Sequence, residues 1–539
     1  MKSKILKYFF VAGLGLTMIF FSCTKLDETV YTELIAEQFN PTESDVASVM
    51  GPIYSNLRNV VSGWAGLYDV IEESSDAIVT PVRPNGWDDG GMYRRMHKHT
   101  WTPEEYHTSA LWTRLYRGVT HANRALYMIE TGTLPIATNK ENYIAEIKTA
   151  RAFYYYLLLD NFGNVPIVTQ FDVEEGFLPA QNTRKQVYDF VESEIKANIE
   201  LLSDVNDATT YGRFNKWAAY TILAKIYLNA EVYTGTPQWA ACLDACNKVI
   251  ASGKYQLEPV YSDLFKTNNE GSTETIFAVP YDDIYGDWLH WHMKTLHPLN
   301  QSTYDLQESP WGGSCAIPQF INTYNSKDKR LAQTWISGQQ FSSGGDSLFC
   351  NMGADKMGLP LNFINFVQSA DYSAEDEGYR MGKYEIKMGA KGMLSNDVPF
   401  FRLADVMMMK AECLLRTGDA GGAATIVSEI RARSFDNPAD ANVTGTQLQG
   451  NSAYAYGFVE NGVITQPDHS GSIQYGRFLD ELGWEFAAEL HRRSDLIRFG
   501  VYTTKTWLSH RPNGAYRSLF PIPQDQLNNN TNLKQNDGY

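Results

Sequence analysis

Apolar residues recur at steps of three and four over long stretches near both ends of the chain, a spacing that places them on one face of an α-helix. The pattern predicts helices over 109–130, 141–161 and 187–202. Gly163 follows the second helix as a stop signal, and Pro166 comes soon after it. The apolar positions of the first two helices are Leu111, Leu115, Val119, Ala122, Leu126, Ile144, Ile147, Ala150, Phe153, Tyr154 and Leu157.

Two further segments each contain a pair of helical patterns joined by a turn. The segment 217–252 has its turn at 234–237 and ends before Gly253, and the segment 404–433 has its turn at 417–419. Two helices within about 35 residues, with the small Ala224 at their crossing, resemble a tetratricopeptide unit. Helical hairpins of a more general kind are the alternative. In both cases stacked hairpins build a curved scaffold whose surfaces bind other molecules.

The helical periodicity is lost between 271 and 391, where glycine, proline, aspartate and aromatic residues dominate. Only 275–281 has the pattern of a strand. A second irregular stretch, 79–100, contains the sequence NGWDDGG at 85–91. Because functional residues concentrate on loops that a rigid scaffold holds in place, we expect the site in these two stretches.

A short apolar run at the N-terminus follows three lysines and ends at Ser22 and Cys23. It spans about 14 residues, whereas a membrane helix needs about 20, so it is typical of a secretory signal. Phe20, Phe21, Ser22 and Cys23 resemble a bacterial lipobox, with looser residues than usual at the first two positions. We expect Cys23 to become an acylated N-terminus that anchors the protein to a membrane. An ordinary signal with a chance cysteine is the alternative.

The net charge is −16 and becomes −19 when the three signal lysines are removed. So acidic a body is a poor partner for nucleic acid or for anionic lipid, and a neutral ligand suits it best. Aromatic residues make up 13% of the chain, including 32 Tyr and 12 Trp, which fits recognition by rigid rings. No later stretch approaches the roughly 18 uninterrupted apolar residues of a membrane span.

Five cysteines follow Cys23, and their odd number and scattered spacing argue against a disulfide framework. Cys242 and Cys246 are one helical turn apart and are read as small residues of a helix interface. No histidine or cysteine lies beside them at zinc-site spacing. A bridge between Cys315 and Cys350 is left open. We expect no metal and no other cofactor.

Three segments carry a resemblance to a known family. Residues 151–166 read RAFYYYLLLDNFGNVP. Residues 400–412 read FFRLADVMMMKAE and are continued by WEF at 484–486 and HRRSDLIRFG at 491–500. The chain closes with LFPIPQ at 519–524, Asn530 and QNDGY at 535–539. Over essentially the whole mature chain, and in the same motif order, this resembles the SusD/RagB family of Bacteroidetes outer-membrane lipoproteins.

The resemblance implies a mainly α fold with four tetratricopeptide-like hairpins and an irregular, loop-rich half that carries the binding face. It implies a lipid-anchored protein of the outer membrane, facing the cell surface, that covers a SusC-like TonB-dependent transporter. It also implies capture of glycans without cleavage, although a minority branch handles peptides. The expected division is signal peptide 1–22, lipid tether 23–40, helical part 41–270 with binding loop 79–100, irregular insertion 271–391 and second helical part 392–539.

Sugars present apolar C–H faces that indole rings match, so a row of coplanar tryptophans suits a flat, extended polysaccharide. Family members that bind β-glucans such as xyloglucan have such a platform in the corresponding loops, so the resemblance favours xyloglucan or another β-glucan here. The alternative is that these tryptophans only pin down their loops. The expected platform is Trp87, Trp288 and Trp311, with Tyr285 and Trp291 as weaker candidates and Asp88, Asp282 and Arg94 as hydrogen-bonding partners of sugar hydroxyls.

Two other functions were weighed against glycan binding. Glu485, Glu489, His491 and Asp495 fall in one predicted helix, where a carboxylate pair would suggest a glycoside hydrolase. Both glutamates share one helical face, however, so they would not flank a bond from opposite sides, and a solvated, salt-bridged surface is the better reading. A peptide-import subunit of the same architecture is the second alternative. Aspartates at 282, 283 and 287 lack the spacing of a calcium loop.

Overall fold

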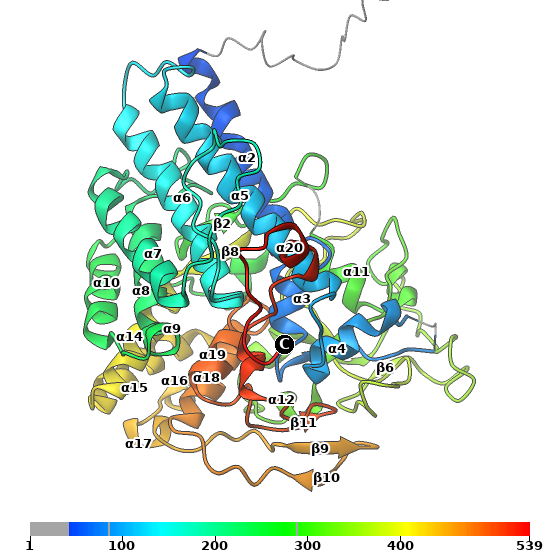
Figure 1. The fold of residues 1–539 in the computed structure, drawn as a ribbon. Coiled ribbons are helices and arrows are strands. Elements are labelled where there is room, and N and C mark those ends of the chain that lie inside the picture. Colours follow the sequence, from blue (N-terminus) through cyan, green and yellow to red (C-terminus); the bar gives the residue numbers. More distant parts are fainter. Residues whose placement is uncertain (1–41, 85–86, 287–288) are drawn as a thin grey trace, which may run out of the picture.

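The computed structural model describes residues 42–84, 87–286 and 289–539. Cys23 and the predicted signal lie outside these residues, and so does Trp288. In Figure 1, long helices stack in one half of the molecule, and short helices and loops make up the other half. Within the described part of the chain, no helix combines the length and the apolar character that a membrane span needs.

Four helical hairpins form the scaffold, and consecutive helices of the stack pack against one another (Figure 1). The predicted helices over 109–130 and 141–161 are confirmed as α5 and α6, and the prediction over 187–202 as α7 followed by a short 3-10 turn. The hairpin pairs are α2 (Val46–Val61) with α5 (Tyr106–Glu130), α6 (Lys140–Asn161) with α7 (Arg184–Asn198), α8 (Lys216–Leu228) with α10 (Trp239–Ala251), and α14 (Leu403–Arg416) with α15 (Ala420–Arg431).

Side-chain caps begin several of these helices where the sequence supplies Thr, Asn or Asp. Thr183 forms a capping box with Gln186 at the start of α7. Asn215 accepts the backbone N–H groups of residues 217 and 218 at the start of α8. Asp419 caps α15 directly after Gly418, which has a φ of 96° and ends the preceding helix region. The turn between α14 and α15 is therefore encoded locally.

A two-stranded antiparallel sheet joins the middle of the chain to its C-terminal part. β2 (Thr275–Val279) pairs with β8 (Val398–Arg402), and both strands are fully buried. The strand expected over 275–281 is thus found, two residues shorter. Phe153 of α6 packs on Phe277, Phe400 and Phe401 of this sheet. The sheet therefore packs against the helical hairpins.

The remaining elements are short, and most of them build the loop-rich half. Helices are α3 (Leu67–Glu72), α4 (Met92–Lys98), α9 (Ala230–Thr234), α11 (Trp291–Thr295), α12 (Pro318–Ile321), α13 (Arg330–Thr334), α16 (Pro438–Ala441), α17 (Gly445–Leu448), α18 (Gly476–Phe486), α19 (Arg492–Arg498) and α20 (Gln524–Asn529). Strand pairs are β1 (Ile78–Val79) with β3 (Cys315–Ala316), β4 (Trp335–Ile336) with β7 (Arg380–Met381), and β5 (Gly338–Gln339) with β6 (Asn362–Phe363); β9 (Gly457–Glu460) lies between β10 (Val463–Pro467) and β11 (Trp507–Leu508).

The C-terminal motif packs directly against the end of α6. Phe520 donates its backbone N–H to the carbonyl of Asn161 at 2.8 Å. The side chain of Asn536 donates to the carbonyls of Phe162 and Phe520, both at 2.9 Å. Two segments about 360 to 370 residues apart in sequence are thereby joined.

Candidate functional site

An aromatic cluster lies where the end of α2 meets the two irregular stretches. It consists of Trp64, Trp87, Tyr93, His290 and Trp311. Trp87 and Trp311 are 6.3 Å apart between ring centroids, and Trp64 is 6.4 Å from Trp87 and 5.9 Å from Trp311. His290 contacts Trp64 and Trp311 at 6.1 and 5.4 Å. Trp311 is 36% exposed, and Trp64 and Trp87 are half-buried.

The indole planes in this cluster are not coplanar. Trp87 and Trp311 meet at 84°, and Trp64 and Trp311 at 68°, whereas Trp64 and Trp87 are 28° from parallel. The expectation of coplanar tryptophans is therefore wrong for Trp87 and Trp311, whose rings form a corner. The reason is that each ring is fixed by its own loop, so their relative angle depends on how the loops pack.

Close backbone contacts hold the three tryptophans. Trp87 donates its indole N–H to Asp89 at 2.6 Å, and its ring lies on the Cα of Gly313. The backbone N–H groups of Trp311 and Gly313 donate to the carbonyls of residues 293 and 294 in α11. Arg114 of α5 donates to the carbonyl of Trp64 at 2.6 Å. The scaffold helix α5 and the short helix α11 thus position rings that come from loops.

A buried cation lies beneath the cluster. The ammonium of Lys294 is 2.6 Å from Asp69, 2.7 Å from Glu73 and 4.1 Å from the ring centre of Tyr93. Burial opposes the charge of Lys294, but the two carboxylates outweigh it and raise its pKa. Burial also raises the pKa of Glu73. Lys294, Asp69 and Glu73 are already paired with one another, so they stabilise the base of the aromatic cluster, and only the rings above them are left to contact a ligand.

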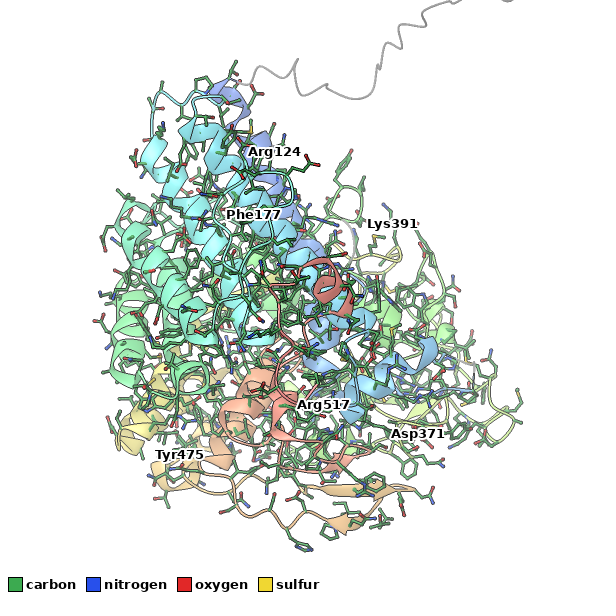
Figure 2. All side chains as sticks on the ribbon, in the orientation of Figure 1. Arg124, Phe177, Asp371, Lys391, Tyr475 and Arg517 are labelled. Carbon is green, nitrogen blue, oxygen red and sulfur yellow. The ribbon has the colours of Figure 1, made fainter. Side chains whose placement is uncertain are left out.

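The predicted polar partners divide into two groups. Asp88 and Arg94 lie beside the cluster as an ion pair of 2.6 Å, and both side chains are partly exposed. Arg94 is also 3.6 Å from Asp371, which Figure 2 labels on the loop-rich side. Asp282 instead accepts the backbone N–H groups of residues 284 and 285, and these bonds lower its pKa. Its carboxylate holds a turn, and Tyr285 at the tip of that turn is 87% exposed.

Trp291 lies in the core. It is 2% exposed and stacks on Tyr68 at 4.3 Å, with Tyr384 against its edge at 4.9 Å. The prediction that Trp291 is a candidate for glycan binding is therefore wrong, because the first turn of α11 faces α3 and buries the ring. Trp288 lies outside the described residues, so its role stays a prediction.

Three members of the cluster were not among the predicted residues: Trp64, Tyr93 and His290. A signal existed for Trp64, because the sequence SGWAG at 62–66 has the same glycine-rich composition as the loop around Trp87. Ala65 there has a φ of 60°, in the turn between the end of α2 at Val61 and the start of α3 at Leu67. Tyr93 falls on a helical face and His290 in a mixed stretch, so neither had a distinguishing pattern.

The carboxylates considered for hydrolysis are buried ion-pair partners. Glu485 is fully buried and binds Arg402 and Arg433 at 2.8 and 2.7 Å, and Glu489 binds Arg402 at 2.7 Å. Arg330 adds a third contact to Glu485 at 2.8 Å. The expected salt bridges are confirmed, but the expected solvated surface is wrong, because arginines from distant segments bury these carboxylates. The expected single helix is also wrong, because α18 ends at Phe486 and α19 begins at Arg492. No bond of a substrate can reach these groups.

Among the described residues no group of three or more His, Cys, Asp or Glu side chains has the arrangement of a metal site. The five cysteines after Cys23 are buried free thiols, Cys315 and Cys350 included.

The stacked helical hairpins define a scaffold of the kind whose surfaces bind other molecules, and this scaffold carries the aromatic cluster. A family described as "Starch-binding associating with outer membrane" matches residues 41–228, and the family described as "SusD family" matches residues 251–539. The chain belongs to the SusD family, and the homologues and structural neighbours that it matches are non-catalytic starch- or glycan-binding proteins.

Relatives and solved structures cover nearly the whole chain. A SusD-like protein of Formosa agariphila is 25% identical over 96% of both chains, and the starch-binding protein SusD of Bacteroides thetaiotaomicron is 24% identical over 84% of this chain and 82% of its own. A laminarin-binding SusD-like protein superposes with a TM-score of 0.70 at 20% identity, covering 93% of this chain and all of its own. Surface glycan-binding protein A of Bacteroides thetaiotaomicron, in complex with laminarihexaose, gives 0.66 at 18% identity, covering 92% of this chain and 99% of its own.

Proposed function

We propose that the protein captures polysaccharide or oligosaccharide at the aromatic cluster and delivers it to a SusC-like TonB-dependent transporter of the outer membrane. The observation that carries this proposal is the corner formed by Trp87 and the partly exposed Trp311, with the Asp88–Arg94 ion pair beside it. Indole faces bind the C–H faces of sugars, and a paired carboxylate and guanidinium exchange hydrogen bonds with hydroxyls.

The angle between the rings bears on the kind of glycan. Successive sugars of a flat β-glucan such as xyloglucan lie close to one plane, so a single chain stacks on one indole of the corner. A chain whose sugars turn from one unit to the next meets both Trp87 and Trp311. Starch and laminarin chains turn in this way, and two of the similar proteins carry those ligands in their names. We therefore place both ahead of xyloglucan.

Affinity gels containing amylose, laminarin or xyloglucan test the proposal. We expect retardation by amylose or laminarin and its loss in Trp87→Ala and Trp311→Ala. Phe177→Ala is the matched control, because Phe177 is 46% exposed, is not part of the cluster and lies on the helical half (Figure 2). Retardation that is unchanged in both tryptophan variants would place the glycan elsewhere. Co-purified peptides together with no retardation on any gel would favour peptide import.

The tether and the transporter are parts of the same proposal. Acylated Cys23 would hold the protein on the outer membrane, facing the cell surface, since several acyl chains give a stable anchor where one does not. Cys23→Ala in cells should move the protein from the membrane fraction to the soluble fraction. Affinity purification of the wild type from solubilised membranes should recover a TonB-dependent transporter encoded beside it.

A further inference from the structure

We propose that the glycan-binding surface continues from the aromatic cluster along α2 to a second subsite at the other end of that helix, which holds distal units of the same neutral chain. The proposal rests on the proposed function, because its ligand is the polymer captured at the cluster. In Figure 1, α2 runs from the top of the molecule towards α3 at its centre.

The second subsite, here called the α2 groove, consists of two adjoining hollows of about 330 and 310 Å³. Both are lined by Tyr143 and Arg213, so they form one depression. The first is floored by Met50, Gly51 and Tyr54 of α2. The second is lined by the polar side chains of Asn139, Asn142, Thr209 and Thr210.

An ion pair between Arg213 and Glu146, with Tyr54 hydrogen-bonded to it, holds the groove in place. Arg213 donates to both oxygens of Glu146, at 2.9 and 2.6 Å, and Tyr54 donates to the same carboxylate. Tyr54 also stacks on Phe214 at 5.8 Å. Because the cation and the anion neutralise each other, the groove offers a half-buried tyrosine and amide and hydroxyl groups without net charge. This combination suits the apolar faces and hydroxyls of a neutral sugar.

A continuous line of contacts joins the groove to the aromatic cluster. Next to Arg213, Gly212 lies so close to Pro280 that a Cβ there would be 2.8 Å from the proline ring. The carbonyl of Pro280 accepts a hydrogen bond from Arg58 of α2 at 2.7 Å, and Gly286 lies against the same guanidinium. Farther along this loop, His290 contacts Trp64.

These contacts follow the helix in order. Gly51, Tyr54 and Arg58 fall on one face of α2, and Gly51 and Val61 are roughly 15 Å apart at about 1.5 Å per residue. The exposed Tyr285 belongs to the loop that crosses this face midway, beside Arg58. A short oligosaccharide fills the cluster alone, whereas a polymer that leaves the cluster along α2 reaches the groove.

Blocking the groove tests this without touching the cluster. A Cβ at Gly51 meets no atom within 4 Å and the residue has a helical backbone, so Gly51→Trp fills the groove and removes no contact. Gly51→Ala is the matched control, and Tyr143→Ala removes an aromatic ring that lines both hollows. Binding of amylose, laminarin, maltotriose and laminaritriose is measured by calorimetry for the wild type and the three variants.

We expect Gly51→Trp and Tyr143→Ala to weaken polymer binding by about tenfold, the size of one lost aromatic contact, with trisaccharide affinity unchanged. Gly51→Ala should match the wild type for every ligand. Polymer affinity unchanged in both groove variants, or an equal loss for trisaccharide, overturns the second subsite while the proposed function stands. If the wild type binds none of the four ligands, the proposed preference for starch or laminarin fails, and the subsite proposed for these chains fails with it.

Discussion

The indole of Trp87 lies on the backbone of Gly313 so closely that a Cβ at position 313 would be 1.5 Å from Cζ3 of the ring. Trp87 comes from the first irregular stretch and Gly313 from the second. Trp311 lies two residues before Gly313. Trp87 can take its observed angle to Trp311 because Gly313 has no side chain that would displace the ring. This contact leads to the first prediction.

Gly313→Ala should displace Trp87 and reduce glycan affinity, with a stability loss of about 1–3 kcal/mol from overpacking. Gly271→Ala is the matched control, because a Cβ there meets nothing within 4 Å. Affinity gels and urea unfolding of both variants check this. If Gly313→Ala binds glycan as the wild type does, the angle of Trp87 is not part of recognition.

Trp87→Ala should mainly reduce glycan binding, whereas Trp291→Ala should mainly reduce stability. Trp291 is buried between Tyr68 and Tyr384, so its removal should cost about 3–5 kcal/mol of unfolding free energy. Trp87 is half-buried at the surface, so its loss should abolish glycan retardation and lower the thermal midpoint far less. A stable Trp291→Ala protein that loses binding would return Trp291 to the site.

Arg402 should be among the most sensitive positions for stability. It is 1% exposed and binds Glu274, Glu485 and Glu489 at 2.7–2.8 Å. Arg402→Met keeps the apolar stem but leaves buried carboxylates without this cation, which should cost about 3–5 kcal/mol. Lys185→Ala, in the exposed pair with Asp189, is the control and should cost less than about 1 kcal/mol. Equal urea midpoints for the two variants would contradict this account.

Buried histidines should make the protein less stable as pH falls. Burial lowers the pKa of His97 and of His99 to about 3, from an ordinary value of about 6.5. Below about pH 6.5 these histidines become protonated in the unfolded chain but stay neutral in the folded protein. Each of them therefore lowers the free energy of unfolding by up to about 1.4 kcal/mol per pH unit until the pH reaches its pKa in the folded state. Glu72 acts in the opposite direction, because burial raises its pKa to about 7.

His99→Asn isolates this effect. His99 has a φ of 51°, a conformation that asparagine tolerates. The asparagine side chain is shorter than the imidazole, so the variant loses the contact of Nε2 with the carbonyl of Ser74 at every pH, and the comparison rests on the change in stability between the two pH values. Urea unfolding of wild type and variant at about pH 7 and about pH 5 should show a smaller loss of stability in the variant. Identical losses would mean that His99 does not contribute to the acid sensitivity.

Much of the helical scaffold was predictable because its causes are local. The three-and-four spacing placed α5 and α6 within three residues of their observed starts, and the turn at Gly418 separates α14 from α15 as expected. The polar face that contains Glu485 was misread as solvated. Its burial depends on Arg330, Arg402 and Arg433, which periodicity cannot place against it.

The sequence by itself determined the helical hairpins, the family pattern and the two glycine-rich stretches that hold Trp87 and Trp311. Only the tertiary structure decided that these rings meet at 84°, that Trp64 joins them and that Trp291 is buried. Hydrophobic periodicity reports which residues share a face of one element. The corner is made by loops more than 200 residues apart in sequence, and its angle is set by backbone packing such as that of Trp87 on Gly313.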